Sequence, residues 1–342
     1  MVPPDFQMPN HRDEKGEYIP VSIEGLMTGL AQELELYVRA GNAFFLVKPR
    51  NMALTPALVG RFLGKFPYLY IGRLDREKYY KSLESNISSI VGSSSYSVRE
   101  KASVLNDYAV EIVDRLIKDP SSATAMVAAK DLSEETVKFI SQQKHAFIHL
   151  VELSNHDQYT YAHSVGVSAY CAALAMAVGR WTKEEISNIA LAGLLHDIGK
   201  CMVDPAIINK EGPLSPNEWE QMKKHPSFGY EILIKHKNLD PIIPLVAEAH
   251  HEDLLGRGYP KGVVASTLEP AVLVSSIADA FSALTTKRSY SPPRNSLAAL
   301  GLMRESISKK FDPHYFEIFI KMFLDPAKKD SAETLNKLKK AG

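Results

Sequence analysis

The chain has 342 residues, enough for two domains or for one large domain with an appendage. Forty basic residues balance 40 acidic ones and 45% of the residues are hydrophobic, which is typical of a globular protein and gives no sign of a DNA, RNA or anionic-membrane partner. The two cysteines, Cys171 and Cys201, exclude a disulfide framework or a thiolate zinc site and fit a reducing cytoplasm.

Neither a signal peptide nor a membrane-spanning helix is evident in the sequence. The first 18 residues contain no apolar core of the kind that signal peptides have. The most apolar run, residues 165–179, is too short to cross a bilayer and is interpreted as a buried helix. We therefore expect a cytoplasmic protein with no membrane insertion.

Residues 18 to about 90 alternate short strand-like and helical segments. Two apolar runs on either side of Gly41 and Asn42 predict a β-hairpin, because Gly-Asn favours a tight turn. Further runs predict a helix at 55–66, a strand at 68–72 and a helix at 76–91. We expect a small N-terminal α/β domain, residues 1–92, with a regulatory or protein-binding role.

The composition changes at residues 92–97, which marks the predicted domain boundary. Beyond it strand patterns almost disappear and helical periodicity dominates. The predicted helices are 97–117, 121–129, 133–154, 159–179, 183–195, 215–234, 241–252, 270–285, 295–309 and 313–323. We therefore predict a mainly α protein with an all-α C-terminal bundle at residues 151–325, connecting helices at 93–150 and a Lys-rich tail at 326–342.

Seven of the eleven histidines lie between residues 156 and 251. A single histidine on a helix usually has an ordinary hydrogen-bonding role, and a single aspartate is usually partly exposed. The joint pattern indicates more, because adjacent helical residues are about 100° apart, so His196 and Asp197 can enter one site together, as can His250 and His251. Asp279 lies in an apolar helix, where an unpaired carboxylate would be costly.

Five imidazoles and two carboxylates are nitrogen and oxygen donors of the kind that divalent first-row transition metals take. Seven donors are too many for one tetrahedral ion, but they suit two ions that share Asp197 as a bridge. Two such ions can clamp the attacking and leaving oxygens of a phosphoester displacement. We expect phosphoester hydrolysis, with the metal ligands His163, His196, Asp197, His225, His250, His251 and Asp279.

The order of these residues resembles the H…HD…D pattern of the HD phosphohydrolase superfamily. The strings HDIGK, HHEDLLGRGYP and IADAFSALTTKRSY, together with His225, resemble the HD-GYP subfamily over about residues 155–320. The resemblance implies an HD-type helical bundle and a phosphodiesterase that opens cyclic di-GMP to pGpG and in some members to GMP. It also implies iron or manganese, while the ligand types suit zinc equally. It allows a diguanylate cyclase or another signalling protein as a partner.

Carried over by position, the resemblance assigns ligands to two ions. His163, His196, Asp197 and Asp279 would hold the first ion, and Asp197, His225, His250 and His251 the second. Lys200 would face the scissile phosphate, Arg288 would bind a phosphate or stack on guanine, and Gly258 and Tyr259 would form the ligand groove. The alternative for Lys200 is an interaction with a helix dipole, and for Tyr259 it is loop packing.

Two departures from the family pattern bear on function. Tyr159 stands where some members have the glutamate that holds a third ion, so we predict two ions. Leu255, Lys287, Ser289 and Ser291 replace residues that relatives commonly have at the groove rim. Two alternatives therefore stay open: a cyclic di-GMP receptor or partner-binding module with little or no turnover, and an HD phosphohydrolase that acts on another nucleotide.

Overall fold

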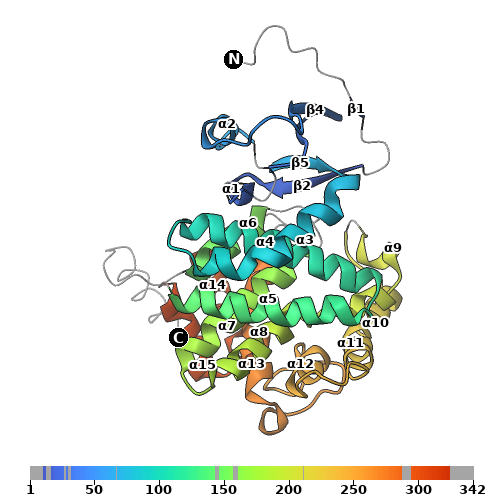
Figure 1. Ribbon diagram of the computed structural model, residues 1–342. Helices are drawn as coiled ribbons and strands as arrows, with labels where there is room; N and C mark the ends of the chain where they lie inside the picture. The colour runs from blue at the N-terminus through green and yellow to red at the C-terminus, as the bar shows by residue number, and fades with distance from the viewer. Residues whose placement is uncertain are drawn as a thin grey trace. The chain divides into compact units, whose positions relative to one another are not determined.

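The computed structural model describes residues 11–12, 17–26, 28–29, 32–66, 68–142, 146–156, 161–210, 212–286 and 294–323 (Figure 1). Its contacts divide the chain into two compact units, Met1–Glu111 and Ile112–Gly342. The predicted boundary after residue 92 coincides with the end of a helix, and the predicted domain limits stay predictions. Each unit is described by itself.

The first unit contains a five-stranded antiparallel sheet with the strand order β1-β4-β3-β5-β2. Its strands are β1 (His11–Arg12), β2 (Tyr18–Ser22), β3 (Leu36–Ala40), β4 (Ala43–Lys48) and β5 (Tyr68–Gly72). The predicted hairpin is confirmed, because Ala40 pairs with Ala43 across a turn in which Gly41 has φ +60°. Only glycine adopts this conformation without steric cost.

Helices accompany the sheet of the first unit. They are α1 (Ile23–Leu26), α2 (Pro56–Gly60), the 3₁₀ turn η1 (Arg73–Asp75), α3 (Arg76–Gly92) and most of α4 (Val98–Lys118). The predicted helix at 55–66 was too long, since α2 ends at Gly60. Asp107 of α4 is buried and accepts hydrogen bonds from Ser22 N and Oγ, at 3.0 and 2.8 Å, and from Tyr79 Oη at 3.2 Å. These bonds join β2, α3 and α4.

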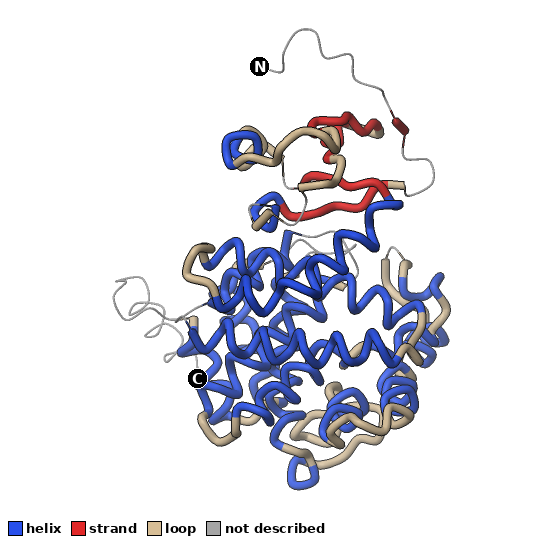
Figure 2. The backbone as a smooth tube through the Cα atoms, in the orientation of Figure 1, coloured by secondary structure: helices blue, strands red, loops and turns tan. Residues whose placement is uncertain are grey.

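The second unit is helical. Its helices are α5 (Ala123–Gln142), α6 (Ala146–His156), α7 (Ala162–Val178), α8 (Lys183–Leu195), α9 (Pro205–Ile208), α10 (Pro216–Met222), α11 (His225–Leu233), α12 (Ile242–Ala249), α13 (Pro270–Thr285), α14 (Ser296–Leu302) and α15 (Pro313–Met322). Shorter helical segments are η2 (Ile198–Met202), η3 (Ala265–Thr267), η4 (Met303–Ile307) and η5 (Ser308–Lys310). Within the described part of this unit, strand pairing is limited to one isolated bridge between Leu255 and Val264 (Figure 2).

Helix α7 forms the centre of the second unit. It is apolar around its whole circumference, which is typical of a helix enclosed by others, and it packs against α6, α8, α13 and α15. An aromatic cluster of Tyr170, Phe281 and Phe319, with ring centroids 5.0–5.7 Å apart, joins α7, α13 and α15. The prediction of a helical bundle with a small sheet-containing N-terminal region is therefore confirmed. Among the described residues, every helix is too short or too polar to cross a bilayer.

Several predicted helix boundaries of the second unit were wrong: the predicted helix 133–154 spans parts of α5 and α6, 241–252 ends at Ala249, 295–309 ends as an α-helix at Leu302, and two breaks between helices were misplaced. The predicted helix at 215–234 is two helices, α10 and α11, which meet at a break before Pro226. Pro226 has no backbone N–H to continue the hydrogen bonds of α10, and proline suits the first turn of a new helix, which explains the break. The predicted interruption near residue 131 does not occur, because Ser133 is accommodated within α5 by a hydrogen bond to the carbonyl of Ala129 at 2.9 Å.

Candidate metal centre

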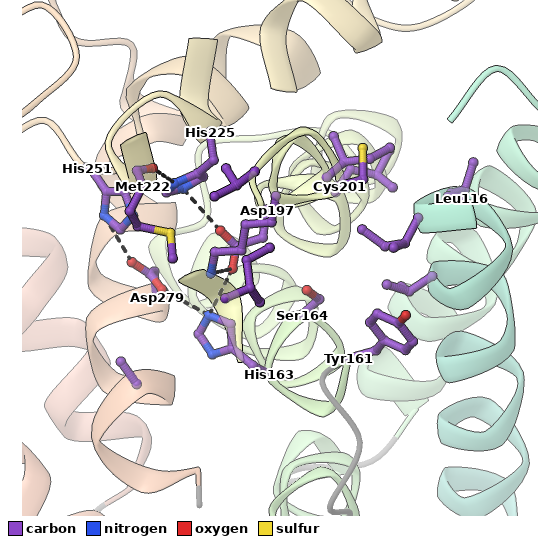
Figure 3. A pocket seen from close by; sticks show the side chains of 18 of the residues that line it. Leu116, Tyr161, His163, Ser164, Asp197, Cys201, Met222, His225, His251 and Asp279 are labelled. Carbon is purple, nitrogen blue, oxygen red and sulfur yellow. Dashed lines mark hydrogen bonds and ion pairs between the residues drawn. The ribbon is translucent and has the colours of Figure 1, made fainter. Parts of the chain in front are cut away.

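Five helices of the second unit bring all seven predicted metal ligands into one cluster. Figure 3 labels His163, Asp197, His225, His251 and Asp279 of this cluster. His163 lies in the first turn of α7, and Asp279 lies within α13. The other ligands occupy helix ends: His196 and Asp197 follow α8, His225 begins α11, and His250 and His251 follow α12. The paired residues thus enter the site from helix ends, where the chain turns, and not from helix interiors.

Asp197 lies between two groups of histidines. Its Oδ2 atom is 3.2 Å from Nε2 of His196 and 3.8 Å from Nε2 of His163. Its Oδ1 atom is 3.2 Å from Nε2 of His225 and 3.9 Å from Nε2 of His250. The two oxygens of one carboxylate therefore face different histidine pairs, which is the arrangement that a bridging ligand requires.

Asp279 lies next to both groups as well. Its Oδ1 atom is 3.1 Å from Nε2 of His163 and 3.8 Å from Nε2 of His196, and its Oδ2 atom is 3.6 Å from Nδ1 of His251. Metal-ligating atoms of His163, His196 and Asp197 lie within 4.8 Å of one another, as do those of three other histidines, His225, His250 and His251. Each group is compact enough to surround a metal ion.

Backbone carbonyls fix the orientation of three imidazole rings. In His196, His225 and His250, Nδ1 donates a hydrogen bond to the carbonyl oxygen three residues earlier, at 2.8, 2.8 and 2.9 Å. A carbonyl only accepts, so Nδ1 carries the proton and Nε2 of a neutral ring presents a lone pair to the cluster. His163 differs, because its Nδ1 lies 2.9 Å from the side-chain oxygen of Ser282.

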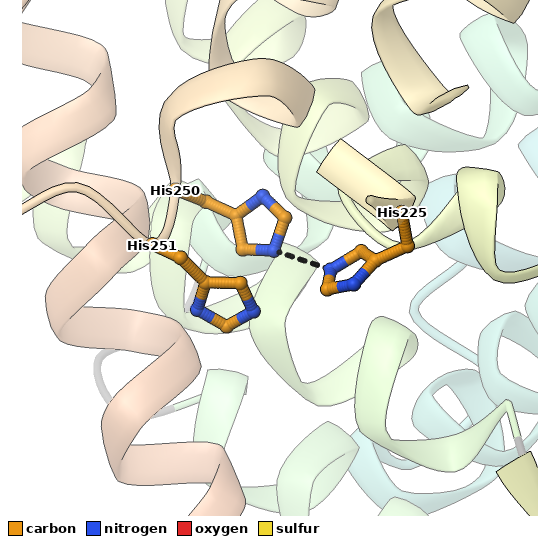
Figure 4. Close-up of side chains that lie close together, drawn as sticks. All are labelled: His225, His250 and His251. Atoms are coloured by element: carbon orange, nitrogen blue, oxygen red, sulfur yellow. Dashed lines mark hydrogen bonds between the residues drawn. The ribbon is translucent and has the colours of Figure 1, made fainter. Parts of the chain in front are cut away.

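In neutral rings with the proton on Nδ1, these lone pairs face one another. Nε2 of His225 and Nε2 of His250 are 3.3 Å apart (Figure 4), and Oδ1 of Asp197 lies 3.2 Å from the first of them. Nε2 of His196 and Oδ1 of Asp197 are buried and have no hydrogen-bond partner among the described residues. Converging lone pairs repel one another unless a cation lies between them, so this donor set fits a metal ion.

The cluster also favours the protonation states that bind metals. Burial lowers the pKa of His163, of His250 and of His251, the last to about 4, so these rings are neutral at pH 7. Burial alone would raise the pKa of Asp197, but the nearby charges of His196 and Lys200 hold it well below its usual value. Neutral imidazoles and ionised carboxylates are the ligand forms that metal binding requires.

Lys200 lies beside the shared carboxylate. The turn η2 directs it back toward the cluster, where its Nζ is 2.5 Å from Oδ2 of Asp197, and about one third of its side chain is exposed. Lys200 lines a pocket of about 720 Å³, whose lining also includes His163, Asp197, His225, His251, Tyr259 and Asp279. Leu116 and Tyr161 line the pocket at a distance from the metal-ligand cluster (Figure 3). The pocket is therefore elongated, with the cluster toward one end.

The segment after His251 carries the predicted groove residues. Tyr259 lines the pocket, and its ring centroid is 4.6 Å from that of His251. Gly258 lies against the backbone of Glu252 and Asp253, so any side chain there would overlap main-chain atoms. Sequence reasoning gave no role to Glu252, although the buried carboxylate accepts hydrogen bonds from three consecutive backbone N–H groups of this loop, at 2.7–3.1 Å. The only indication of a structural role for Glu252 in the sequence was its position next to His251.

The remaining predictions on substrate contacts fall on other parts of the chain. Arg288, the predicted phosphate or guanine contact, lies outside the described residues, as do Lys287, Ser289 and Ser291. Tyr159, at the position of the third-ion glutamate, also lies outside them.

Comparison with known proteins places this architecture in a family. The HD domain family model matches residues 140–315, more than half of the chain. The chain belongs to the HD domain family. The chain is 34% identical over 193 residues to the cyclic di-GMP phosphodiesterase PA4108 of Pseudomonas aeruginosa. The aligned region covers 56% of this chain and 46% of that protein. The resemblance to the HD-GYP family is thereby confirmed.

Two further comparisons extend this picture. The HD domain chain is 32% identical over 222 residues to the 3'3'-cGAMP-specific phosphodiesterase 3 of Vibrio cholerae, covering 60% of this chain and 47% of that protein. Its fold is similar to that of Bd1817, a HDG"Y"P protein from Bdellovibrio bacteriovorus, with a TM-score of 0.69 and 20% identity over 89% of this chain and 98% of that one. The chain spans about half the length of the curated relatives that it matches.

Proposed function

We propose that this protein is a metal-dependent phosphodiesterase that hydrolyses cyclic di-GMP to pGpG, with GMP as a further product, at a binuclear centre. The observation that carries the proposal is the position of Asp197, whose two oxygens face different histidine pairs. The names of relatives support the substrate, since two of them, at 34% and 29% identity, are cyclic di-GMP phosphodiesterases.

The ligand assignment follows from the two groups. His163, His196, Asp197 and Asp279 would hold one divalent ion, and Asp197, His225, His250 and His251 the other. We propose iron, with manganese or zinc as alternatives, because imidazole and carboxylate suit all three. When bound, the two ions would supply Lewis acidity for the attack of water on phosphorus.

The residues of the chain itself would bind the substrate and stabilise charge. Lys200 places an ammonium group beside the shared carboxylate and in the pocket, where it would stabilise negative charge that develops on the phosphoryl group. Gly258 and Tyr259 would form one wall of the groove, and Arg288 would contact a phosphate or a base. A pocket of about 720 Å³ is within the usual size range for organic ligands and leaves room for more than a phosphate group.

The decisive test is the variant Asp197→Ala. Because this carboxylate is shared, its removal should reduce the metal content of both sites and abolish hydrolysis of cyclic di-GMP. Elemental analysis of protein purified without chelator, followed by a product assay, measures both effects. Asp131→Ala, which changes an exposed aspartate on α5, is the matched control and should retain metal and activity. Full metal content in Asp197→Ala would contradict the binuclear assignment.

A second candidate function is hydrolysis of another cyclic dinucleotide. It is favoured by the relative named as a 3'3'-cGAMP-specific phosphodiesterase. A comparison of kcat/KM for cyclic di-GMP, 3'3'-cGAMP and cyclic di-AMP distinguishes the two. Binding without any product, after loading with iron and with manganese, would instead support a receptor role. A diguanylate cyclase or another signalling protein as partner, and a cytoplasmic location, stay predictions.

A further inference from the structure

Trp219 is a large aromatic side chain that lines the pocket without serving the core. It is 44% exposed, and its helix α10 contains no buried residue. Other interactions hold α10 in place: Ser215 and Glu218 form a capping box at its start, and Glu218 pairs with Lys210 at 2.6 Å. The indole is therefore not needed to anchor its helix, which leaves its exposed surface available to a ligand.

The position of Trp219 is tied to the metal-ligand cluster. Helix α10 ends at Met222, whose backbone carbonyl accepts the hydrogen bond from Nδ1 of His225 at 2.8 Å. The same segment therefore carries the indole of Trp219 and, through the carbonyl of Met222, orients the predicted metal ligand His225, which lies six residues after Trp219. Trp219 therefore has a fixed position relative to any group that is bound at the metal-ligand cluster.

A row of aromatic rings runs from the cluster to this indole. The ring of Tyr259 lies 4.6 Å from that of His251, at an interplanar angle of 33°. Trp219 in turn contacts Tyr259 edge to face, with centroids 5.9 Å apart and an angle of 76°. An edge-to-face contact holds the indole in orientation. The pocket wall therefore leads from a predicted phosphate-binding end to an aromatic surface.

The chemistry of this wall suits a nucleobase. In a nucleotide the base is joined to the phosphate through the sugar, so it must lie to one side of the group that is cleaved. The pocket part lined by Val113, Leu116 and Ile117 of α4 offers aliphatic side chains, and the aromatic ring of Tyr161 lies at a distance from the cluster (Figure 3), whereas Trp219 contacts Tyr259, which lies next to His251. Aliphatic side chains offer contact area, whereas an indole also offers a ring on which a base can stack.

We propose that Trp219 is the base-stacking residue of the substrate pocket, and that one purine of a cyclic dinucleotide lies against its indole while a phosphate lies at the metal-ligand cluster. The inference rests on the proposed function and names the residue that makes the site selective for nucleotides. Tyr259 acts as the support that orients the indole. The stack is to the base and not to the phosphate, so it should affect only ligands that carry a base.

Steady-state kinetics of Trp219→Ala and Trp219→Phe test the stack. Loss of a stacking ring should raise KM for cyclic di-GMP about 5- to 100-fold in Trp219→Ala, with kcat and metal content near those of the native protein. Trp219→Phe keeps a ring and should restore most of the affinity. The inhibition constant of inorganic phosphate, which has no base, should be the same in all three proteins. An unchanged KM in Trp219→Ala would overturn the inference.

Tryptophan fluorescence gives an independent readout, because the chain has only two tryptophans. Trp181 packs against Tyr315, with ring centroids 6.0 Å apart, and against the guanidinium of Arg180. In Trp181→Phe, cyclic di-GMP should quench the remaining emission with saturation and inorganic phosphate should not. In Trp219→Phe, neither ligand should change the emission of the remaining tryptophan, Trp181.

The outcomes separate the two proposals. If the native protein hydrolyses or binds cyclic di-GMP but the emission of Trp219 is unaffected, the base-stacking inference fails alone. If the native protein neither binds nor hydrolyses any cyclic dinucleotide, the proposed function fails, and the stacking role fails with it. Thermal unfolding of each variant is the control for folding, and it should be unchanged because Trp219 is half exposed.

Discussion

Four of the five imidazole rings of the candidate centre, those of His163, His196, His225 and His250, are held by the nitrogen that faces away from it. In three rings the acceptor is a carbonyl of the preceding turn, which no side-chain substitution can remove. The fourth ring, His163, instead contacts a side chain, Ser282, which is fully buried on α13. Hydrogen bonds of this kind select the tautomer and direction of a ligand ring. Ser282 is therefore the residue through which ring orientation can be tested.

Substitution of Ser282 by alanine should weaken the binding of one ion and leave the binding of the other unchanged. Without its hydrogen-bond partner, His163 loses a fixed orientation, so the affinity of the first ion should fall about 10- to 100-fold. A chelator-competition titration with metal analysis measures each site. Ser276→Ala on the same helix is the control, because its hydroxyl donates a hydrogen bond to the carbonyl of Leu273 in its own helix, at 3.1 Å. Equal losses in the two variants would disprove the positioning role.

Lys200 should affect the reaction rate and not metal binding. Its ammonium group lies 2.5 Å from Oδ2 of Asp197 but donates no electron pair to a metal. Lys200→Ala should lower kcat about 10²- to 10³-fold, the usual effect of removing a group that stabilises transition-state charge. Lys223→Ala, which removes a lysine of similar exposure paired with Glu220 at 2.7 Å, should have the native kcat. Native activity in Lys200→Ala would show that the assigned role is wrong.

At the scale of the helices, sequence patterns predicted which elements exist better than how they end. The limits of the predicted helices at 183–195 and 270–285 are those of α8 and α13. Apolar periodicity and start residues define such helices locally. The break between α10 and α11 was missed, although Pro226 indicated it, and this break determines where His225 points.

The seven candidate ligands were predictable because their chemistry and order are visible in the sequence. The groups that orient them were not, since Gly193, Met222 and Ala247 contribute only a backbone carbonyl. A carbonyl is present in every residue, so no residue type distinguishes these three. The contact between Ser282 and His163, 119 residues apart, depends on packing of α7 against α13, which periodicity does not give.

The turn η2 lies very close to α11 at Gly199. A side chain at Gly199 would overlap the carbonyl oxygen of His225 and the backbone nitrogen of Gly229. Gly199→Ala should therefore displace α11, destabilise the protein by about 1–3 kcal/mol or more and reduce the metal content of the second site. Gly301→Ala is the matched control, because nothing lies within 4 Å of its added methyl group and alanine favours helices by about 1 kcal/mol. In urea unfolding, the free energy of unfolding of Gly301→Ala should be higher than that of the native protein, and that of Gly199→Ala should be lower.

At the scale of the whole molecule, the candidate centre joins elements that are distant in the sequence. Its ligands come from α7, from the ends of α8 and α12, from the start of α11 and from α13. Such a cluster exists only in the folded second unit. Metal ions that bind it should therefore stabilise the folded state over the unfolded chain.

The same cluster makes stability depend on pH. The pKa of His163, of His250 and of His251 is lowered by burial, the last to about 4, whereas an unfolded histidine has a pKa of about 6.5. As pH falls below about 6.5 the unfolded chain binds protons that these folded rings do not, so the free energy of unfolding should decrease. His196 acts in the opposite sense, because Asp197 overcomes the effect of burial and raises its pKa, but one ring opposes three.

Urea unfolding of chelator-treated protein at pH 7.5, 6.5, 5.5 and 4.5 measures this dependence. The free energy of unfolding should be nearly constant above pH 6.5 and decrease at each step below it. With metal bound the decrease should be steeper, since protons then compete with the ions for the same imidazole nitrogens. A free energy that stays constant down to pH 4.5 in both forms would mean that these histidines are neither buried as neutral rings nor ligands of a metal.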